Sequence, residues 1–130
     1  MGVVQSIDHI NLRTPQLEET LSFYEQLLGL RRGRAAGMDQ ARNAWLYDDA
    51  DKPIIHVNMP EESEAVPEPI HSGRLHHVAL DCAGFDGTVD RIAELGLESS
   101  HNYIDEIGLR QIFVFDPNGV RLELNFRKGM

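Results

Sequence analysis

The stretch Asp8-His9-Ile10-Asn11-Leu12 decides the fold, because a similar stretch, His76-His77-Val78-Ala79-Leu80, opens the second half of the chain. In both, the residues after the last histidine are apolar at every second position, which is the pattern of a half-buried strand. We therefore expect strands over residues 6–13 and 75–81. Two such beginnings predict that one structural unit occurs twice.

The spacing of later residues extends this repeat. Counted from His9, a glycine that can end a helix lies 20 residues on, and His56 lies 47 residues on. Counted from His77, the corresponding glycine lies 19 residues on, and Glu123 lies 46 residues on. The offsets agree within one residue, so each half contributes one histidine near its start and one potential metal ligand near its end.

Each half is expected to follow the order βαβββ. In the first half a helix follows Thr14-Pro15, with proline at its first position, and ends at Gly29, whereas residues 30–44 carry no clear pattern. The other expected elements are strands 44–47 and 54–59, a helix at 86–95 ending at Gly96, and strands 111–115 and 120–126 joined by the turn Asp116-Pro117-Asn118-Gly119. The fold class is α+β, with two tandem βαβββ modules, curved mixed sheets and helices outside.

Length and composition indicate one domain of 130 residues. It comprises modules 1–59 and 74–130, joined by an exposed linker, 60–73, that is rich in proline and glutamate. The formal charge of −9 argues against nucleic acid or a membrane surface as partner. The single cysteine, Cys82, excludes an internal disulfide and favours a cytoplasmic location, and we expect it to be packed rather than reactive. We see no secretory signal and no membrane span.

Strand alternation places the potential ligands opposite the apolar residues that would pack on the helices. His56, for example, lies between Ile55 and Val57, and Glu123 lies between two leucines. Taken singly, such residues are typical of a wet strand face. Four at equivalent positions favour a metal site on the curved faces of the sheets, with these ligands: His9, His56, His77 and Glu123.

Imidazoles with one carboxylate suit a divalent ion such as Fe, Ni, Co, Zn or Mn and leave positions open for water and substrate. An ion so held can polarise a carbonyl group. Glu123 or His56 beside it can move a proton. The sequence therefore predicts a metal-dependent enzyme that acts on a small molecule.

At this point the sequence resembles the vicinal oxygen chelate (VOC) superfamily, which includes glyoxalase I, methylmalonyl-CoA epimerase, fosfomycin-resistance transferases, extradiol dioxygenases and bleomycin-binding proteins. The resemblance covers nearly the whole chain. It is carried by these four stretches: Asp8-His9-Ile10-Asn11-Leu12, Ser22-Phe23-Tyr24-Glu25-Gln26-Leu27-Leu28-Gly29-Leu30, Leu75-His76-His77-Val78-Ala79-Leu80 and Phe115-Asp116-Pro117-Asn118-Gly119-Val120-Arg121-Leu122-Glu123-Leu124.

The resemblance implies a glyoxalase-like fold of paired modules that form a metal-binding cavity, usually in a homodimer. It places His9, His77 and Glu123 at ligand positions of the superfamily. His56 falls where glyoxalase I carries a glutamate, so a neutral nitrogen replaces an anionic oxygen there.

Three functions stay open. With four potential ligands, we favour a glyoxalase I-like lyase or isomerase whose small substrate chelates the metal through adjacent oxygens. An Fe(II) extradiol dioxygenase would use His9, His77 and Glu123 as its metal ligands. The resemblance to those enzymes implies a tyrosine ten residues before the ligand glutamate, but this chain has Phe113 there. His101 is also off the register expected for their acid/base histidine. A non-catalytic protein that binds a cationic, bleomycin-type antibiotic would suit the acidic charge. A fosfomycin transferase is disfavoured, since residues 105–110 do not resemble its serine-rich loop.

Several neighbours of the potential ligands are secondary candidates. Arg121 and Asn125 share the strand face of Glu123, which makes them candidates to contact substrate or to support the ligands. Trp45 could line the cavity, although a core or edge position is the commoner role of such an aromatic residue. His76 is expected to point away from His77 and to be structural.

Overall fold

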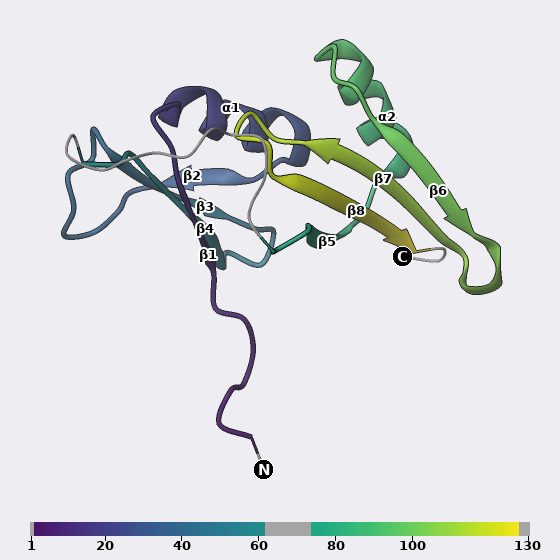
Figure 1. Ribbon diagram of the computed structural model, residues 1–130, viewed down its shortest axis with the longest axis horizontal. Coiled ribbons are helices and arrows are strands. Elements are labelled where there is room, and N and C mark those ends of the chain that lie inside the picture. Colours follow the sequence, from purple (N-terminus) through teal and green to yellow (C-terminus); the bar gives the residue numbers. More distant parts are fainter. Residues whose placement is uncertain (1, 62–73, 128–130) are drawn as a thin grey trace. The chain divides into compact units, whose positions relative to one another are not determined.

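Figure 1 shows the computed structural model of the protein, which describes residues 2–61 and 74–127. The chain divides into two compact units, residues 1–66 (unit 1) and 67–130 (unit 2). The linker expected at 60–73 lies outside the described residues from position 62 on. Unit 1 consists of β1 (Ile10–Arg13), α1 (Leu17–Leu28), β2 (Arg31–Gly33), β3 (Asn43–Tyr47) and β4 (Pro53–Asn58).

Unit 2 repeats this order with one short addition. It consists of β5 (Val78–Cys82), α2 (Phe85–Glu94), β6 (Ser100–Ile104), the 3-10 turn η1 (Asp105–Ile107), β7 (Leu109–Phe115) and β8 (Arg121–Arg127). The expected α+β class and the βαβββ order are thus confirmed in both units. None of the helices in the described residues is long and apolar enough to cross a membrane.

The two sheets share one topology. Their strand orders are β1-β4-β3-β2 and β5-β8-β7-β6; the first pair of each is parallel and the others are antiparallel. The register of the parallel pair repeats as well, since Asn11 lies opposite His56 and Ala79 lies opposite Glu123. In both units the histidine is the residue just before the first strand, so the sequence repeat is a structural repeat.

Helix α1 forms because apolar residues recur on one side of it. Leu21, Tyr24 and Leu27 are buried against the sheet, and Gly29 ends the helix with a left-handed φ of 69°. The expected start at Thr14-Pro15 is wrong, since α1 begins at Leu17. The Thr14 hydroxyl instead accepts the backbone N–H of Gln16 at 2.9 Å, within the turn before the helix.

The hairpin of β7 and β8 builds the core of unit 2. Asp116 Oδ1 accepts the backbone N–H groups of Asn118 and Val120, which fixes the turn expected at 116–119. This turn sets the register in which Phe113 lies opposite Glu123. Four buried side chains form the apolar face of the hairpin: Ile112, Val114, Leu122 and Leu124.

Two edge strands were not located from the sequence. β2 lies in the segment 30–44, which carried no pattern, and β6 has every residue exposed. β2 has only three residues, two of them exposed, and β6 buries none of its residues, so no buried apolar alternation marks either strand. For this reason hydrophobic periodicity did not predict these two strands.

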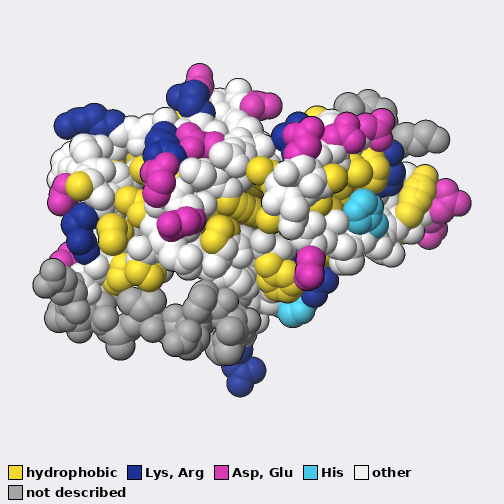
Figure 2. Space-filling model, turned by 90° about the horizontal axis from the view of Figure 1, so that it is seen from above, with side chains coloured by type: hydrophobic (Ala, Val, Ile, Leu, Met, Phe, Trp, Pro, Cys, Tyr) yellow, Lys and Arg dark blue, Asp and Glu magenta, His cyan; other side chains and the backbone are white. Residues whose placement is uncertain are grey.

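Charged side chains on the surface are mixed in sign. On the face seen in Figure 2, Lys and Arg side chains lie beside Asp and Glu side chains. In unit 1, Arg32 donates hydrogen bonds to Glu18 at 3.0 Å and to Glu25 at 2.6 Å. These bonds tie the edge strand β2 to α1.

Candidate metal centre

His77 and Glu123 form a direct pair in unit 2. His77 Nε2 lies 3.5 Å from Glu123 Oε1, and the Glu123 side chain is 16% exposed. Within the described residues, no Lys or Arg forms an ion pair with this carboxylate. A carboxylate so far removed from water favours a cation beside it.

Side-chain amides hold the other oxygen of Glu123. Asn125 donates from Nδ2 to Glu123 Oε2 at 2.9 Å, and Gln111 donates from Nε2 to Asn125 Oδ1 at 3.1 Å. Asn102 completes the chain by donating from Nδ2 to Gln111 Oε1 at 2.9 Å. Each amide donates toward the carboxylate, and both Asn125 and Gln111 are buried. The chain therefore orients Glu123 and leaves Oε1 directed at His77.

In unit 1, His9 is oriented by the acid that precedes it. Its Nδ1 lies 2.5 Å from Asp8 Oδ2, and this contact lowers the pKa of the Asp8 carboxyl below its ordinary value, mainly through the hydrogen bond. Because the carboxylate accepts the Nδ1 proton, the lone pair of a neutral His9 lies on Nε2. A carboxylate behind the imidazole is a common arrangement at metal-bound histidines.

The His56 side chain contacts two residues of β3. Its ring stacks on Trp45 with centroids 4.8 Å apart, and its Nε2 lies 3.0 Å from Asn43 Oδ1, which accepts the Nε2 proton. The lone pair of neutral His56 is therefore on Nδ1. Burial, with smaller contributions from His9 and Arg13, lowers the pKa of His56 below its ordinary value. The imidazole is thus neutral at pH 7 and able to bind an ion or accept a proton.

Trp45 links the two histidines of unit 1. The His9 ring meets the Trp45 ring edge-on with centroids 4.7 Å apart, while His56 stacks on the same indole. The structure thus brings His77 and Glu123 into contact, and it brings His9 and His56 against one common neighbour. Within either unit, the described residues hold no group of three or more His, Cys, Asp or Glu that could bind an ion.

Sequence reasoning missed several supporting residues and misjudged one. His76 was expected to point away from His77, but their Nδ1 atoms lie 2.9 Å apart. The parity argument failed because β5 begins only at Val78, so neither histidine lies in the strand. Asp8 and Gln111 were not singled out; Gln111 could have been found from the turn at 116–119, which sets it opposite Asn125. The sharing of one face by Asn125 and Glu123 is confirmed.

The described residues fit a divalent ion. Two ligands about 2.1 Å from one ion, at tetrahedral angles, lie about 3.4 Å apart. The His77–Glu123 separation of 3.5 Å matches this value with only a slight shift. The imidazole nitrogens and the carboxylate oxygen of the four candidate ligands are also donor atoms that divalent Fe, Ni, Co, Zn and Mn bind.

Two neighbouring positions bear on the dioxygenase alternative. Phe113 lies directly opposite Glu123, and the Arg121 guanidinium stands 4.7 Å from its ring centroid, so this position offers no hydroxyl group. His101 pairs with Ile112, which belongs to the apolar face of the sheet. His101 is therefore on the opposite face from Glu123.

Cys82 is partly buried, and this burial raises the pKa of its thiol, as expected for a packed cysteine.

Comparison with known proteins supports the resemblance. The chain is 23% identical over 122 residues to Glyoxylase I 4 of Arabidopsis thaliana, covering 92% of this chain and 69% of that protein. Its fold is similar to that of a glyoxalase/dioxygenase from Nostoc punctiforme, with 20% identity, a TM-score of 0.73 and coverage of 97% and 93% of the two chains. It is also similar to the fosfomycin resistance protein FosX from Listeria monocytogenes, with 15% identity, a TM-score of 0.70 and coverage of 98% and 97%.

At these identities the structural likeness shows the fold alone. The model of one family, however, matches residues 6–124, which is most of the chain. The chain therefore belongs to the Glyoxalase/Bleomycin resistance protein/Dioxygenase superfamily.

Proposed function

We propose that the protein is a divalent-metal-dependent lyase or isomerase of glyoxalase I-like type, acting on a small substrate that chelates the metal through adjacent oxygens. The observation that carries this proposal is the pair His77–Glu123, whose atoms are spaced as two ligands of one ion. The equivalent pair, His9 and His56, occupies the same register positions in unit 1. The repeat thus supplies two pairs of ligands.

The proposed ligand atoms follow from the hydrogen bonds on the opposite side of each group. His9 offers Nε2, since Asp8 accepts its Nδ1 proton, and Glu123 offers Oε1, since Asn125 holds Oε2. His77 offers Nε2, the atom nearest Glu123. When bound, the ion would polarise the adjacent oxygens of the substrate and stabilise negative charge on them.

Proton transfer falls to Glu123 or His56. The lowered pKa of His56 keeps its imidazole neutral, and the Asn43 contact leaves the lone pair on Nδ1. A neutral imidazole can act as a general base. In this proposal His56 therefore takes the place of the glutamate implied by the resemblance to glyoxalase I.

We also propose a homodimer as the working form. The ion requires one pair from each kind of unit, supplied by one chain or by two chains of the dimer. A dimer is the commonest symmetric assembly of soluble chains. Sedimentation velocity on the purified protein tests this part: a single species of one-chain mass would contradict it.

The structure lends less support to the alternatives. Phe113 supplies no hydroxyl group beside Glu123, and His101 lies on the other face of the sheet. Both observations weigh against an extradiol dioxygenase. The ordered amide chain behind Glu123 weighs against a purely non-catalytic antibiotic-binding protein, because such a protein needs no oriented carboxylate.

A proton-exchange assay tests the proposed function. The metal-loaded protein is mixed in D₂O with methylglyoxal and a small thiol, which form a hemithioacetal, and the carbon-bound proton is followed by NMR. We expect a 2-hydroxyacyl thioester to form, the wild type to be the fastest, and His56→Gln to be at least about tenfold slower. Failure of every thiol tested, with the metal still bound, would contradict the lyase or isomerase. Ring opening of a catechol by the iron-loaded protein would favour the dioxygenase.

A further inference from the structure

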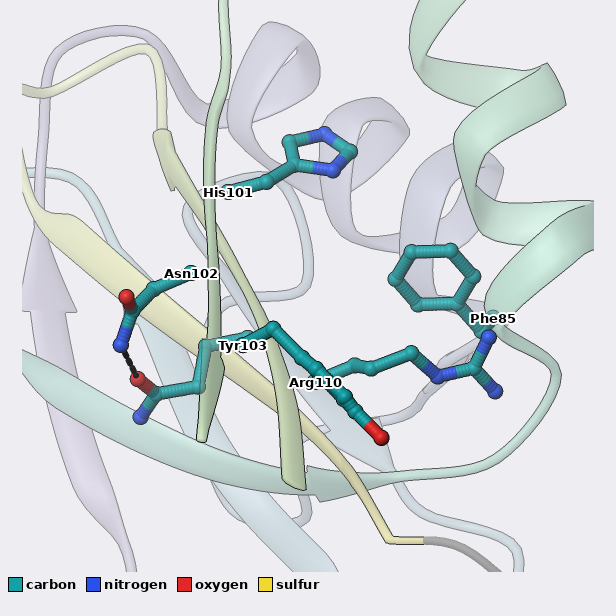
Figure 3. A pocket seen from close by; sticks show the side chains of 6 residues that line it. Phe85, His101, Asn102, Tyr103 and Arg110 are labelled. Atoms are coloured by element: carbon teal, nitrogen blue, oxygen red, sulfur yellow. Dashed lines mark hydrogen bonds between the residues drawn. The ribbon is translucent and has the colours of Figure 1, made fainter. Parts of the chain in front are cut away.

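Unit 2 has a pocket on the face of its sheet opposite Glu123. The pocket has a volume of about 390 Å³, and it lies between the start of α2, the edge strand β6 and β7. Figure 3 shows four side chains directed toward this space: Phe85, His101, Tyr103 and Arg110. Asn102 points to the other side of the strand, where it takes part in the amide chain that ends at Glu123. The pocket is therefore separate from the candidate metal ligands.

Aromatic rings and one cation line this pocket. The Arg110 guanidinium lies over the Phe85 ring, 4.1 Å from its centroid, and the His101 ring meets Phe85 edge-on at 6.0 Å. The second edge contact of Phe85 is to Phe126, which anchors the ring to the core. The Phe85 ring thereby favours one position of the Arg110 guanidinium, and Arg110 remains exposed.

Two hydrogen-bond donors of the pocket, Arg110 and Tyr103, have no acceptor in the described part of the chain. Arg110 forms no hydrogen bond or ion pair with any described residue, and the same holds for the hydroxyl group of Tyr103. The nearest acids along the chain, Glu106 and Asp105, form no ion pair with Arg110 in the described structure. In a protein of charge −9, Arg110 thus keeps a positive charge that no described acidic residue pairs with.

Unit 1 provides an internal comparison. Its corresponding corner, at the start of α1 and the edge strand β2, has a cavity of about 380 Å³. Two arginines line it: Arg32 is ion-paired with Glu18 and Glu25, whereas Arg34 forms no ion pair with a described residue. Neither Phe, Trp, Tyr nor His is among the residues that line this cavity. The two corners therefore differ in their rings: the corner of unit 2 sets its arginine against aromatic side chains, and the corner of unit 1 does not.

We propose that this pocket is a second ligand site, for a small planar carboxylate that carries an aromatic ring. The carboxylate accepts N–H groups of Arg110 in the plane of the guanidinium and the hydroxyl of Tyr103. The ring of the ligand packs against His101 and Phe85. The volume is in the range of small-molecule sites and holds a benzoate-sized molecule.

The probe for this proposal is benzoate, titrated into ¹⁵N-labelled, metal-free protein and followed by two-dimensional amide NMR. We expect saturable shifts at residues 85, 101–103 and 109–111, with a dissociation constant of about 1 mM for a ligand of this size. Benzamide has the same shape without the charge and should bind at least about tenfold more weakly. Acetate, which has no ring, should also bind more weakly.

Matched variants separate the two corners. Arg110→Gln should weaken benzoate binding at least about tenfold, and Tyr103→Phe about threefold. Arg34→Gln removes the same charge from the corner of unit 1 and should leave binding unchanged. If Arg110→Gln fails to fold, the comparison of benzoate with benzamide on the wild type still decides the question. Equal binding of the two probes, an unaltered Arg110→Gln titration, or shifts confined to the surroundings of His77 would overturn the proposal.

Discussion

Asn125 donates a hydrogen bond from Nδ2 to Glu123 Oε2 across 2.9 Å, and it is itself held by Gln111. The two residues are neighbours on one face of β8, two positions apart. This bond fixes one oxygen of the carboxylate and leaves the other facing His77. It makes Asn125 the residue through which the sheet positions the proposed ligand.

Loss of this bond should weaken metal binding while the fold survives. We expect Asn125→Ala to reduce the affinity for Zn²⁺ about tenfold or more, the usual effect of removing a group that orients a ligand. Isothermal titration with Zn²⁺ measures the change, and thermal unfolding of the metal-free variant checks the fold. Asn102→Ala serves as control: Asn102 is two hydrogen bonds further from the carboxylate than Asn125, so its loss should lower the Zn²⁺ affinity less. An affinity equal to that of the wild type would show that Asn125 does not position Glu123.

The contact between Asp8 and His9 should also be visible in metal binding. Asp8→Asn removes the carboxylate that accepts the Nδ1 proton, so the Nε2 lone pair of His9 is no longer favoured. We expect the Zn²⁺ affinity to fall severalfold, and ¹⁵N chemical shifts of the His9 ring to report the altered tautomer. Asp49→Asn, which removes an equal charge elsewhere in unit 1, should change neither quantity. Identical ring shifts in Asp8→Asn and wild type would contradict the assignment of Nε2 as ligand.

The ion pairs of Arg32 should contribute to stability in a pH-dependent way. Hydrogen bonds from Arg32 lower the pKa of Glu18 below its ordinary value of 4.5, and they raise the pKa of Arg32. Because the unfolded chain binds the Glu18 proton more readily, this contribution is present above pH 4.5 and is lost as the pH falls. Since Glu18 is largely exposed, we expect Arg32→Gln to cost only about 1 kcal/mol at pH 7.

Urea unfolding at pH 7 and at acid pH measures this contribution. The difference between Arg32→Gln and wild type should shrink as the pH falls. Arg34→Gln is the matched control, since Arg34 forms no ion pair among the described residues. A difference that grows toward acid pH would contradict the explanation.

The fold could be predicted from the sequence where side chains alternate or repeat. His9 and His77 marked the start of each unit, and the turn at 116–119 fixed the register that sets Phe113 opposite Glu123. The start of α1 was misplaced because a proline after Thr14 is typical both of a first helical turn and of the turn before it. Edge strands such as β6 rest on backbone pairing, which leaves no mark in an all-exposed sequence.

The candidate site could be predicted only in part. Equivalent spacing singled out His56 and Glu123, because a repeated unit repeats its register. The residues that orient them were harder to find, since Asn43 and Gln111 act across strands and their partners depend on pairing rather than on sequence distance. The same holds for the pocket around Arg110, which depends on an aromatic contact made by the first residue of α2.

The measurement that tests the central claim most directly is the metal content of the untagged protein by plasma mass spectrometry. We expect about one transition-metal ion per chain in the wild type and in His101→Ala, whose side chain lies on the other face of the sheet, and loss of that ion in His77→Ala. Iron would favour the dioxygenase alternative, whereas nickel, cobalt, zinc or manganese would favour the lyase or isomerase. A wild type that stays metal-free after incubation with each of these ions would contradict the account.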